Sequence, residues 1–138
     1  MGVSRLRAAM VTCAVGVSLA LGMPGVGLAE SPGMVKASHR TVKEVIADIG
    51  LSVPPRCIAA KQTRSDRAWG TYTLKYRSGC PTSEGYTVIH RSGGSWRALP
   101  LGGSSVPCSY LKQGLSKADA PSSVFRDLKA AGACDAGQ

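Results

Sequence analysis

Apolar residues recur with the spacing of a helix soon after residue 40. They fall at i, i+3, i+4 and i+7, and they are Val42, Val45, Ile46 and Ile49. Thr41 and Glu44 form a capping box, in which each side chain accepts a hydrogen bond from a free backbone N–H at the helix start. Gly50 can adopt the left-handed conformation that ends a helix. The pattern predicts an amphipathic helix whose apolar face needs a partner.

Between residues 57 and 101 the pattern changes to the alternation of strands. The candidate strands are CIAAKQTR (57–64), WGTYTLKYR (69–77), GYTVIHR (85–91) and WRALPL (96–101). Gly93 and Gly94 offer a two-residue hairpin turn. Pro100 cannot donate to a ladder, so the last strand is expected to lie at a sheet edge or to end there. The segment predicts an antiparallel meander of three or four strands.

The two central strands also predict a register and a buried face. The predicted cross-strand pairs are Tyr76 with Tyr86, Leu74 with Val88 and Tyr72 with His90. The other face is polar except for Ile89, and it holds Thr71, Thr73, Lys75, Arg77, Thr87 and Arg91. An antiparallel sheet with one solvated side has this alternation. We therefore expect the three tyrosines to belong to the core.

After the strands, helical patterns return. A short one covers SYLKQGL (109–115), and a clearer one covers PSSVFRDLKAAG (121–132), where Ser122 or Ser123 can cap the start and Gly132 can end the helix. The predicted fold is α+β: an N-terminal helix, the antiparallel meander and a C-terminal helix, with the helices packed on one face of the sheet.

The first 29 residues differ from the rest of the chain. Arg5 and Arg7 precede an apolar run that ends in small residues, which is the layout of a secretory signal peptide. We expect residues 1–29 to be cleaved. A retained membrane span is the first alternative, although Pro24 and several glycines interrupt it. A lipid anchor at Cys13 is the second, although Met-Val-Thr precedes this cysteine instead of the expected Leu-type residue and small residue.

Cleavage defines the predicted domain organisation. Residues 30–40 are polar and without periodicity, so they are predicted to form a mobile arm. Residues 41–138 are short enough for one small α+β domain. The expected location is secreted, extracellular or associated with the cell envelope, with no membrane anchor left after cleavage.

Removal of Cys13 leaves an even number of cysteines. They are Cys57, Cys80, Cys108 and Cys134. In an exported chain such a set indicates two disulfides. Sequential pairing, 57–80 with 108–134, links neighbouring elements and is favoured, but nested pairing, 57–134 with 80–108, stabilises the chain by a similar amount and stays open. No Cys-x-x-Cys or His-x3-His spacing indicates a metal site.

Positive charge and aromatic residues are concentrated together in the predicted strands. Without Arg5 and Arg7 the net charge of +9 becomes +7. The candidate binding residues are Arg64, Arg67, Trp69, Lys75, Arg77, Arg91, Trp96 and Arg97. Cations interleaved with aromatics can hold an anionic polymer, and the two tryptophans near strand ends are the expected exposed rings. Alternatively, the aromatics form the core and the charges serve solubility.

Catalytic constellations are sparse. A small secreted ribonuclease needs a glutamate base, a histidine acid and arginines, and the available residues are Glu44, Glu84, His90, Arg77 and Arg91. Glu44 already caps a helix, and no motif places Glu84 beside His90. Gly-x-Ser-x-Gly and phosphate-binding glycine loops are absent from the sequence. A ribonuclease-type hydrolase remains an alternative, but we expect neither catalysis nor a cofactor.

The expected function is therefore binding. A small basic secreted protein with two disulfides suits an anionic envelope polymer or an acidic protein partner, and nucleic acid is not the expected ligand. The segment RSGCPTSEG (77–85) adds the alternative of a secreted-protease inhibitor that uses loop 78–85. Cys80 tethers this loop and Pro81 stiffens it, so it would lose little entropy on docking. An ordinary hairpin connection accounts for the same residues.

Two segments carry a resemblance to a known group. GYTVIHRSGGSWRALPLG (85–102) and the closing pattern Pro121…Val124…Asp127-Leu128…Cys134 resemble small secreted bacterial proteins of unassigned function. The resemblance implies a small exported protein. It implies no catalytic residue, because the group has no assigned activity.

Overall fold

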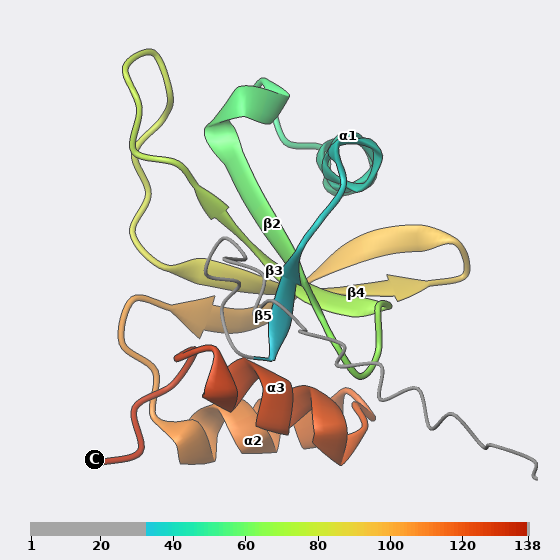
Figure 1. Ribbon diagram of the computed structural model, residues 1–138, viewed down its shortest axis with the longest axis vertical. Coiled ribbons are helices and arrows are strands. Elements are labelled where there is room, and N and C mark those ends of the chain that lie inside the picture. Colours follow the sequence, from blue (N-terminus) through green and yellow to red (C-terminus); the bar gives the residue numbers. More distant parts are fainter. Residues whose placement is uncertain (1–32, 138) are drawn as a thin grey trace, which may run out of the picture.

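The computed structural model describes residues 33–137, and the predicted signal peptide lies outside them. The elements are β1 (Met34–Lys36), α1 (His39–Ile49), the 3₁₀ turn η1 (Pro55–Cys57), β2 (Ile58–Thr63), β3 (Trp69–Leu74), β4 (Tyr86–Ser92), β5 (Ser95–Gly103), α2 (Cys108–Lys117) and α3 (Ser122–Ala130). The strands form one sheet in the order β1-β2-β3-β4-β5, and every neighbouring pair is antiparallel (Figure 1). The α+β class is confirmed.

The number and order of elements differ from the prediction. The described sheet has five strands instead of three or four, and strand β1 precedes helix α1, which is therefore not the N-terminal element. Residues 34–36, predicted to be part of a mobile arm, pair with β2, and Met34 is only 2 % exposed. The sequence did not predict this edge strand, because three residues are too few to show the alternation of a strand and the neighbouring residues are polar.

Helix α1 follows local capping rules, with a shifted start. The hydroxyl of Ser38 accepts the Thr41 N–H at 3.1 Å, so the N-cap lies three residues before the predicted one, Thr41. Gly50 has φ 76°, and its N–H and that of Leu51 both donate to the Ile46 carbonyl at 3.0 Å. This double closure is how a left-handed glycine ends a helix.

Helices cover both faces of the sheet, and not one face as predicted. Val45 of α1 is buried against Ile89 and Trp96 on one face. Leu111 of α2 and Leu128 of α3 are buried on the other. Figure 1 shows α1 on one side of the sheet and α2 with α3 on the other. The protein thus has three layers and an apolar core on each side of the sheet.

The predicted register between β3 and β4 is wrong. The observed pairs are Trp69 with His90, Gly70 with Ile89, Thr71 with Val88 and Tyr72 with Thr87. This differs from the prediction by three residues, and an odd shift sends every side chain of a strand to the opposite face. Tyr72 therefore packs on the α1 side, whereas Tyr86 packs on the α2 and α3 side.

The two disulfides pair sequentially, as favoured from the sequence. Cys57 at the start of β2 bonds to Cys80, and Cys108 at the start of α2 bonds to Cys134 near the C-terminus. Each bridge links segments that lie close in sequence, with separations of 23 and 26 residues. In residues 33–137 no helix has the length and apolar character needed to cross a membrane.

Candidate functional site

The candidate binding residues do not form one surface. They divide between the two ends of β3, a strand of six residues that spans about 17 Å. Lys75 and Arg77 follow its C-terminal end, whereas Arg64 and Arg67 lie in the turn that precedes it. We call the two sets the loop end and the turn end of the sheet.

The two tryptophans are buried, which corrects the expectation that they are the exposed rings. Trp69 is 2 % exposed and stacks on His90, with ring centroids 3.9 Å apart and an angle of 12° between the planes. Trp96 is 1 % exposed beneath α1, and its backbone N–H donates to Asp48 Oδ2 at 2.9 Å. Neither ring is available to stack on a ligand.

Tyr76 is the most exposed aromatic of the described residues instead, with 93 % of its surface open to solvent. The prediction placed it in a strand, but β3 ends at Leu74. The ladder to β4 stops because continued pairing after Tyr72 with Thr87 would bring Leu74 opposite Gly85, whose φ is 88°. A residue with that φ cannot continue an extended strand.

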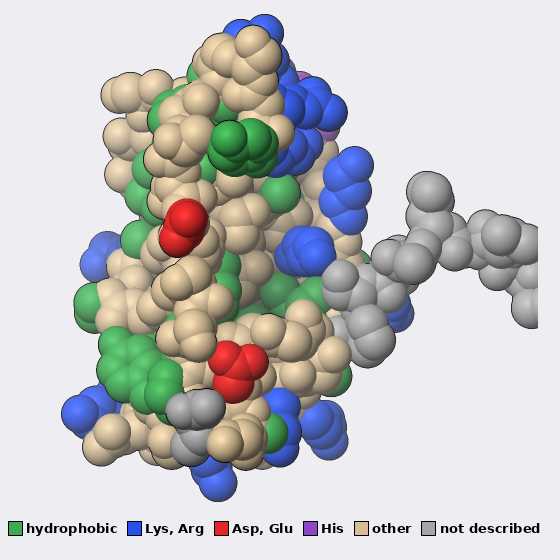
Figure 2. Space-filling model, turned by 90° about the vertical axis from the view of Figure 1, so that its left-hand side faces the viewer, with side chains coloured by type: hydrophobic (Ala, Val, Ile, Leu, Met, Phe, Trp, Pro, Cys, Tyr) green, Lys and Arg blue, Asp and Glu red, His purple; other side chains and the backbone are tan. Residues whose placement is uncertain are grey.

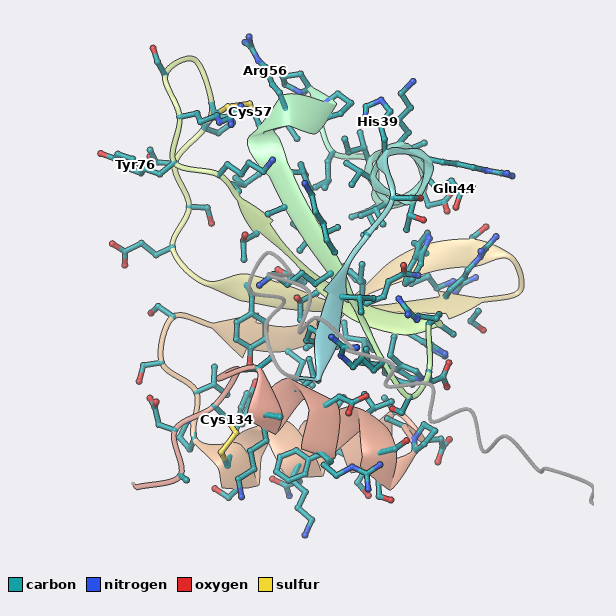
Figure 3. The ribbon with its side chains drawn as sticks, viewed as in Figure 1. His39, Glu44, Arg56, Cys57, Tyr76 and Cys134 are labelled. Atoms are coloured by element: carbon teal, nitrogen blue, oxygen red, sulfur yellow. A yellow bond between two sulfur atoms is a disulfide. The ribbon has the colours of Figure 1, made fainter. Side chains whose placement is uncertain are left out.

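The loop end is organised by the first disulfide. Residues 75–85, which we call the disulfide loop, carry Cys80, whose partner Cys57 is fully buried. The Lys75 N–H donates to the Cys57 carbonyl at 2.7 Å, so the pairing of β2 with β3 continues one residue past the strand. Figure 3 shows Tyr76 pointing away from the protein on this loop, with Arg56 beside Cys57.

Arg56 belongs to the loop end, although the sequence analysis did not include it. An ideal Cβ on Gly79 would lie 3.5 Å from a terminal nitrogen of Arg56, so the guanidinium reaches the disulfide loop. Within residues 33–137, neither a hydrogen bond nor an ion pair engages the side chains of Arg56, Lys75 or Arg77. The sequence contains a signal for this position. Arg56 directly precedes Cys57, and the favoured pairing of Cys57 with Cys80 brings it next to the loop that carries Cys80.

The turn end combines the β2–β3 turn with the β4–β5 hairpin. The Arg91 N–H donates to the Ala68 carbonyl at 2.7 Å, and Arg97 lies opposite His90 in the β4–β5 register. Arg67 is exposed in the same turn, and its carbonyl accepts from the Gln62 side chain at 2.8 Å. The cations of the turn end thus present charge without an exposed aromatic, because Trp69 and Trp96 are both buried.

Most acidic side chains are occupied by donors within the protein. Asp66 accepts the Ala68 N–H at 3.0 Å, and Asp127 accepts the Ser65 N–H at 2.8 Å. Asp48 binds the Trp96 N–H, and Asp135 accepts the Ser105 hydroxyl at 3.0 Å. Since these donors are uncharged, the carboxylates serve the fold while most lysines and arginines remain exposed. Figure 2, which faces the side of the disulfide loop, shows more basic than acidic surface.

Asp127 is the carboxylate with a clear electrostatic shift. Burial by itself raises its pKa, but the hydrogen bonds from Ser65 and the nearby charge of Arg126 outweigh burial and lower the pKa below its ordinary value of 3.8. Folding therefore favours the ionised carboxylate of Asp127. Its hydrogen bond from Ser65 connects α3 to the β2–β3 turn.

The residues of the alternative nuclease site are not brought together. His90 lies on the sheet face opposite α1, which carries Glu44, and Glu44 is paired with Arg40 at 3.1 Å. Glu84 precedes β4, whereas His90 is near the end of that strand. The strand from Tyr86 to His90 alone spans about 13 Å.

Two shallow cavities border the base of the disulfide loop. They have volumes of about 360 and 230 Å³ and share Thr73, Leu74, Ser83, Gly85 and Tyr86 in their walls. The Tyr86 hydroxyl donates to the Ala133 carbonyl at 2.6 Å, and burial, together with the nearby Tyr110, raises the pKa of this phenol to about 12. In the described part of the chain no cluster of His, Cys, Asp and Glu could hold a metal ion.

Comparison with known protein families, characterised proteins and solved structures finds no match for this chain.

Proposed function

We propose that the protein is a small exported binding protein without catalytic activity, which holds an acidic partner through its exposed lysines and arginines. The partner is an anionic polymer of the cell envelope or an acidic protein. One observation carries the proposal: the side chains of Arg56, Lys75 and Arg77 have no acidic partner among the described residues. Four aspartates bind backbone N–H or hydroxyl donors instead, namely Asp48, Asp66, Asp127 and Asp135.

Long-range electrostatics supports this function. The chain without residues 1–29 carries a net charge of +7, because only Arg5 and Arg7 are lost from +9. Exposed charges of one sign attract an oppositely charged partner over about 10 Å at 0.1 M salt, and the attraction weakens as salt rises. Binding should therefore be strongest at low ionic strength.

Salt-dependent retention on an immobilised anionic polymer tests the proposal. We expect the secreted protein to be retained above about 0.1 M salt, where weak, nonspecific attraction is already screened. Replacing Arg56, Lys75 and Arg77 by glutamate should lower the eluting salt concentration. Replacing Lys112, Lys117 and Lys129 of the helical layer by glutamate makes the same change in net charge and is the matched control. Equal shifts in both variants would contradict a site at the loop end.

Export belongs to the same proposal. The signal-peptide pattern of residues 1–29 and the two disulfides support an oxidising compartment outside the cytoplasm. Intact-mass analysis of protein from the culture medium should give a chain that begins at Glu30 and contains no free thiol. Material that retains residues 1–29 or four free thiols would contradict export.

A further inference from the structure

The segment around Tyr76 differs from every other part of the described surface. Tyr76 is 93 % exposed, and the only other large apolar side chain that is exposed in residues 33–137 is Tyr110, at 48 %. Tyrosine and arginine, with tryptophan, are enriched among the residues that dominate protein–protein binding energy, and Arg77 directly follows Tyr76. The segment thus presents one large aromatic flanked by cations.

The chain is fixed on both sides of Tyr76. On one side the Lys75 N–H is held by the Cys57 carbonyl at 2.7 Å. On the other, the Cys80 N–H donates to the Arg77 carbonyl at 3.1 Å, and Cys80 is bonded to the fully buried Cys57. Because the flanks are already ordered, docking of this segment costs less conformational entropy than docking of a free loop.

The backbone of Tyr76 itself is left open. Tyr76 belongs to no helix or strand, and among the described residues no hydrogen bond engages its N–H or C=O. Peptide-binding clefts recognise such a segment through hydrogen bonds to the main chain and a pocket for one side chain. Fixed flanks, a free backbone and a projecting ring together resemble a bound substrate.

A protein cleft fits these features better than a polymer does. Binding along an extended polymer uses several aromatics in a basic groove. Here Trp69 and Trp96 are buried, so no row of stacking rings exists in the described surface. A single ring at the loop end fits a single apolar pocket. Lys75 and Arg77 adjoin Tyr76 in the chain, and Arg56 reaches the same loop at Gly79, so acidic groups at the rim of that pocket would complement them.

We propose that the disulfide loop inhibits an extracellular endopeptidase that prefers large apolar or aromatic residues, with Tyr76 in the primary specificity pocket of the enzyme. This inference rests on the proposed function, because it identifies the acidic partner as a protease whose pocket has an acidic rim. It moves the contact from the predicted loop 78–85 to residues 75–77, which precede Cys80. The carbonyl of Tyr76 then lies where the enzyme would attack.

Inhibition assays with two protease classes test this assignment. The secreted protein is titrated against an aromatic-selective serine endopeptidase of the chymotrypsin or subtilisin type, and against a Lys/Arg-selective one of the trypsin type. We expect inhibition of the first class at near-equimolar mixing. Tyr76→Ala should weaken it by about 100-fold, because truncation removes the group that fills the pocket. Tyr76→Arg should move inhibition to the Lys/Arg-selective enzyme.

Tyr110→Ala is the matched control, since it truncates the other exposed aromatic, on helix α2. It should leave inhibition unchanged. Thermal unfolding of all three variants should match that of the wild type, because both tyrosines lie on the surface. Inhibition that survives Tyr76→Ala would overturn the role of Tyr76. Rapid hydrolysis of the Tyr76–Arg77 bond, with a new carboxyl group on Tyr76 and a new amino group on Arg77, would show a substrate and overturn the inference.

The two proposals can fail separately. Retention on the anionic polymer without inhibition of any aromatic-selective enzyme would overturn the protease assignment and leave the proposed function standing. A different result is inhibition that depends on Tyr76 and yet is insensitive both to salt and to charge reversal at Arg56, Lys75 and Arg77. That result would overturn the acidic rim of the pocket but not the role of Tyr76. Loss of polymer retention in Tyr76→Ala would show that the ring contacts the polymer and would overturn the protein cleft.

Discussion

The two disulfides close loops of similar length, yet the regions they hold are different. Backbone hydrogen bonds surround the Cys108–Cys134 bridge. The Cys108 N–H donates to the Asp135 carbonyl, and the Asp135 N–H donates to the Val106 carbonyl. Tyr86 adds a hydrogen bond to Ala133 in the same region. The Cys57–Cys80 bridge holds a loop whose middle has few bonds of its own.

The difference separates a scaffold from a presenting segment. At the helical end, covalent and hydrogen bonds act on the same few residues and fix α2 and the C-terminal segment against the sheet. At the loop end, one covalent bond and two hydrogen bonds hold Tyr76 outward in solvent. Order without burial serves recognition, because it lowers the entropic cost of binding without adding to the core.

The largest expected effect comes from removing either bridge. Loop closure of this size stabilises a fold by about 3 kcal/mol in the chain-entropy model. We expect Cys108→Ala with Cys134→Ala, and Cys57→Ala with Cys80→Ala, to lower the free energy of unfolding by similar amounts, as measured by urea denaturation.

The two double variants should differ in local behaviour. Loss of Cys57–Cys80 should increase proteolysis within residues 75–85 and abolish binding through Tyr76, while loss of Cys108–Cys134 should leave both unchanged at temperatures where the protein is folded. Limited proteolysis with mass analysis measures the first effect. Equal protection of the disulfide loop in both variants would contradict the division into scaffold and presenting segment.

Asp127→Asn should have the next largest effect, and it tests the ties of the scaffold. Its carboxylate accepts hydrogen bonds from Ser65, and bonds to a charged group contribute about 1.5–3 kcal/mol. Because folding lowers the pKa of Asp127, its stabilisation is present above pH 3.8 and is lost as pH falls through the lower pKa of the folded state. As the pH falls from 5 to below 3.8, the free energy of unfolding should decrease more for the wild type than for Asp127→Asn. Thermal unfolding followed by circular dichroism at each pH measures this difference.

Tyr86→Phe should have the smallest effect, about 1 kcal/mol, because it removes one neutral hydrogen bond to Ala133 beside the second bridge. Folding raises the pKa of this phenol from 10.0 to about 12, so its contribution is present below pH 10 and is lost as pH approaches 12. Thermal unfolding at pH 8 and pH 11 measures the difference. A Phe variant that loses as much stability at pH 11 as the wild type would contradict this role.

Local signals predicted the parts of the fold that depend on neighbouring residues. The apolar spacing and Gly50 located α1, and short separations favoured the observed cysteine pairing. The register of β3 with β4 depends on where Gly85 and its neighbours leave the strand, and that backbone conformation is not visible in a pattern of apolar positions.

The candidate site was predicted less well for the same reason. The alternation of WGTYTLKYR suggested that Tyr76 continues a strand, but the strand stops before it and the ring turns outward. The tryptophans near strand ends are buried because helices cover both faces of the sheet. Sequence alone pointed to Lys75, Arg77 and the tethered loop, while the structure added Arg56 and showed that Tyr76 is the aromatic exposed beside them.

The position of Tyr76 inside the ring closed by Cys57 and Cys80 has a consequence for what happens after an attack on the chain. If a protease severs the peptide bond after Tyr76, the sulfur bridge still joins the two pieces. The β3–β4 ladder also holds them together, because β3 belongs to the first piece and β4 to the second. The fresh ends remain near one another instead of diffusing apart. Under non-reducing electrophoresis a nicked molecule would migrate as a single band, and it would separate into two only after the bridge is reduced.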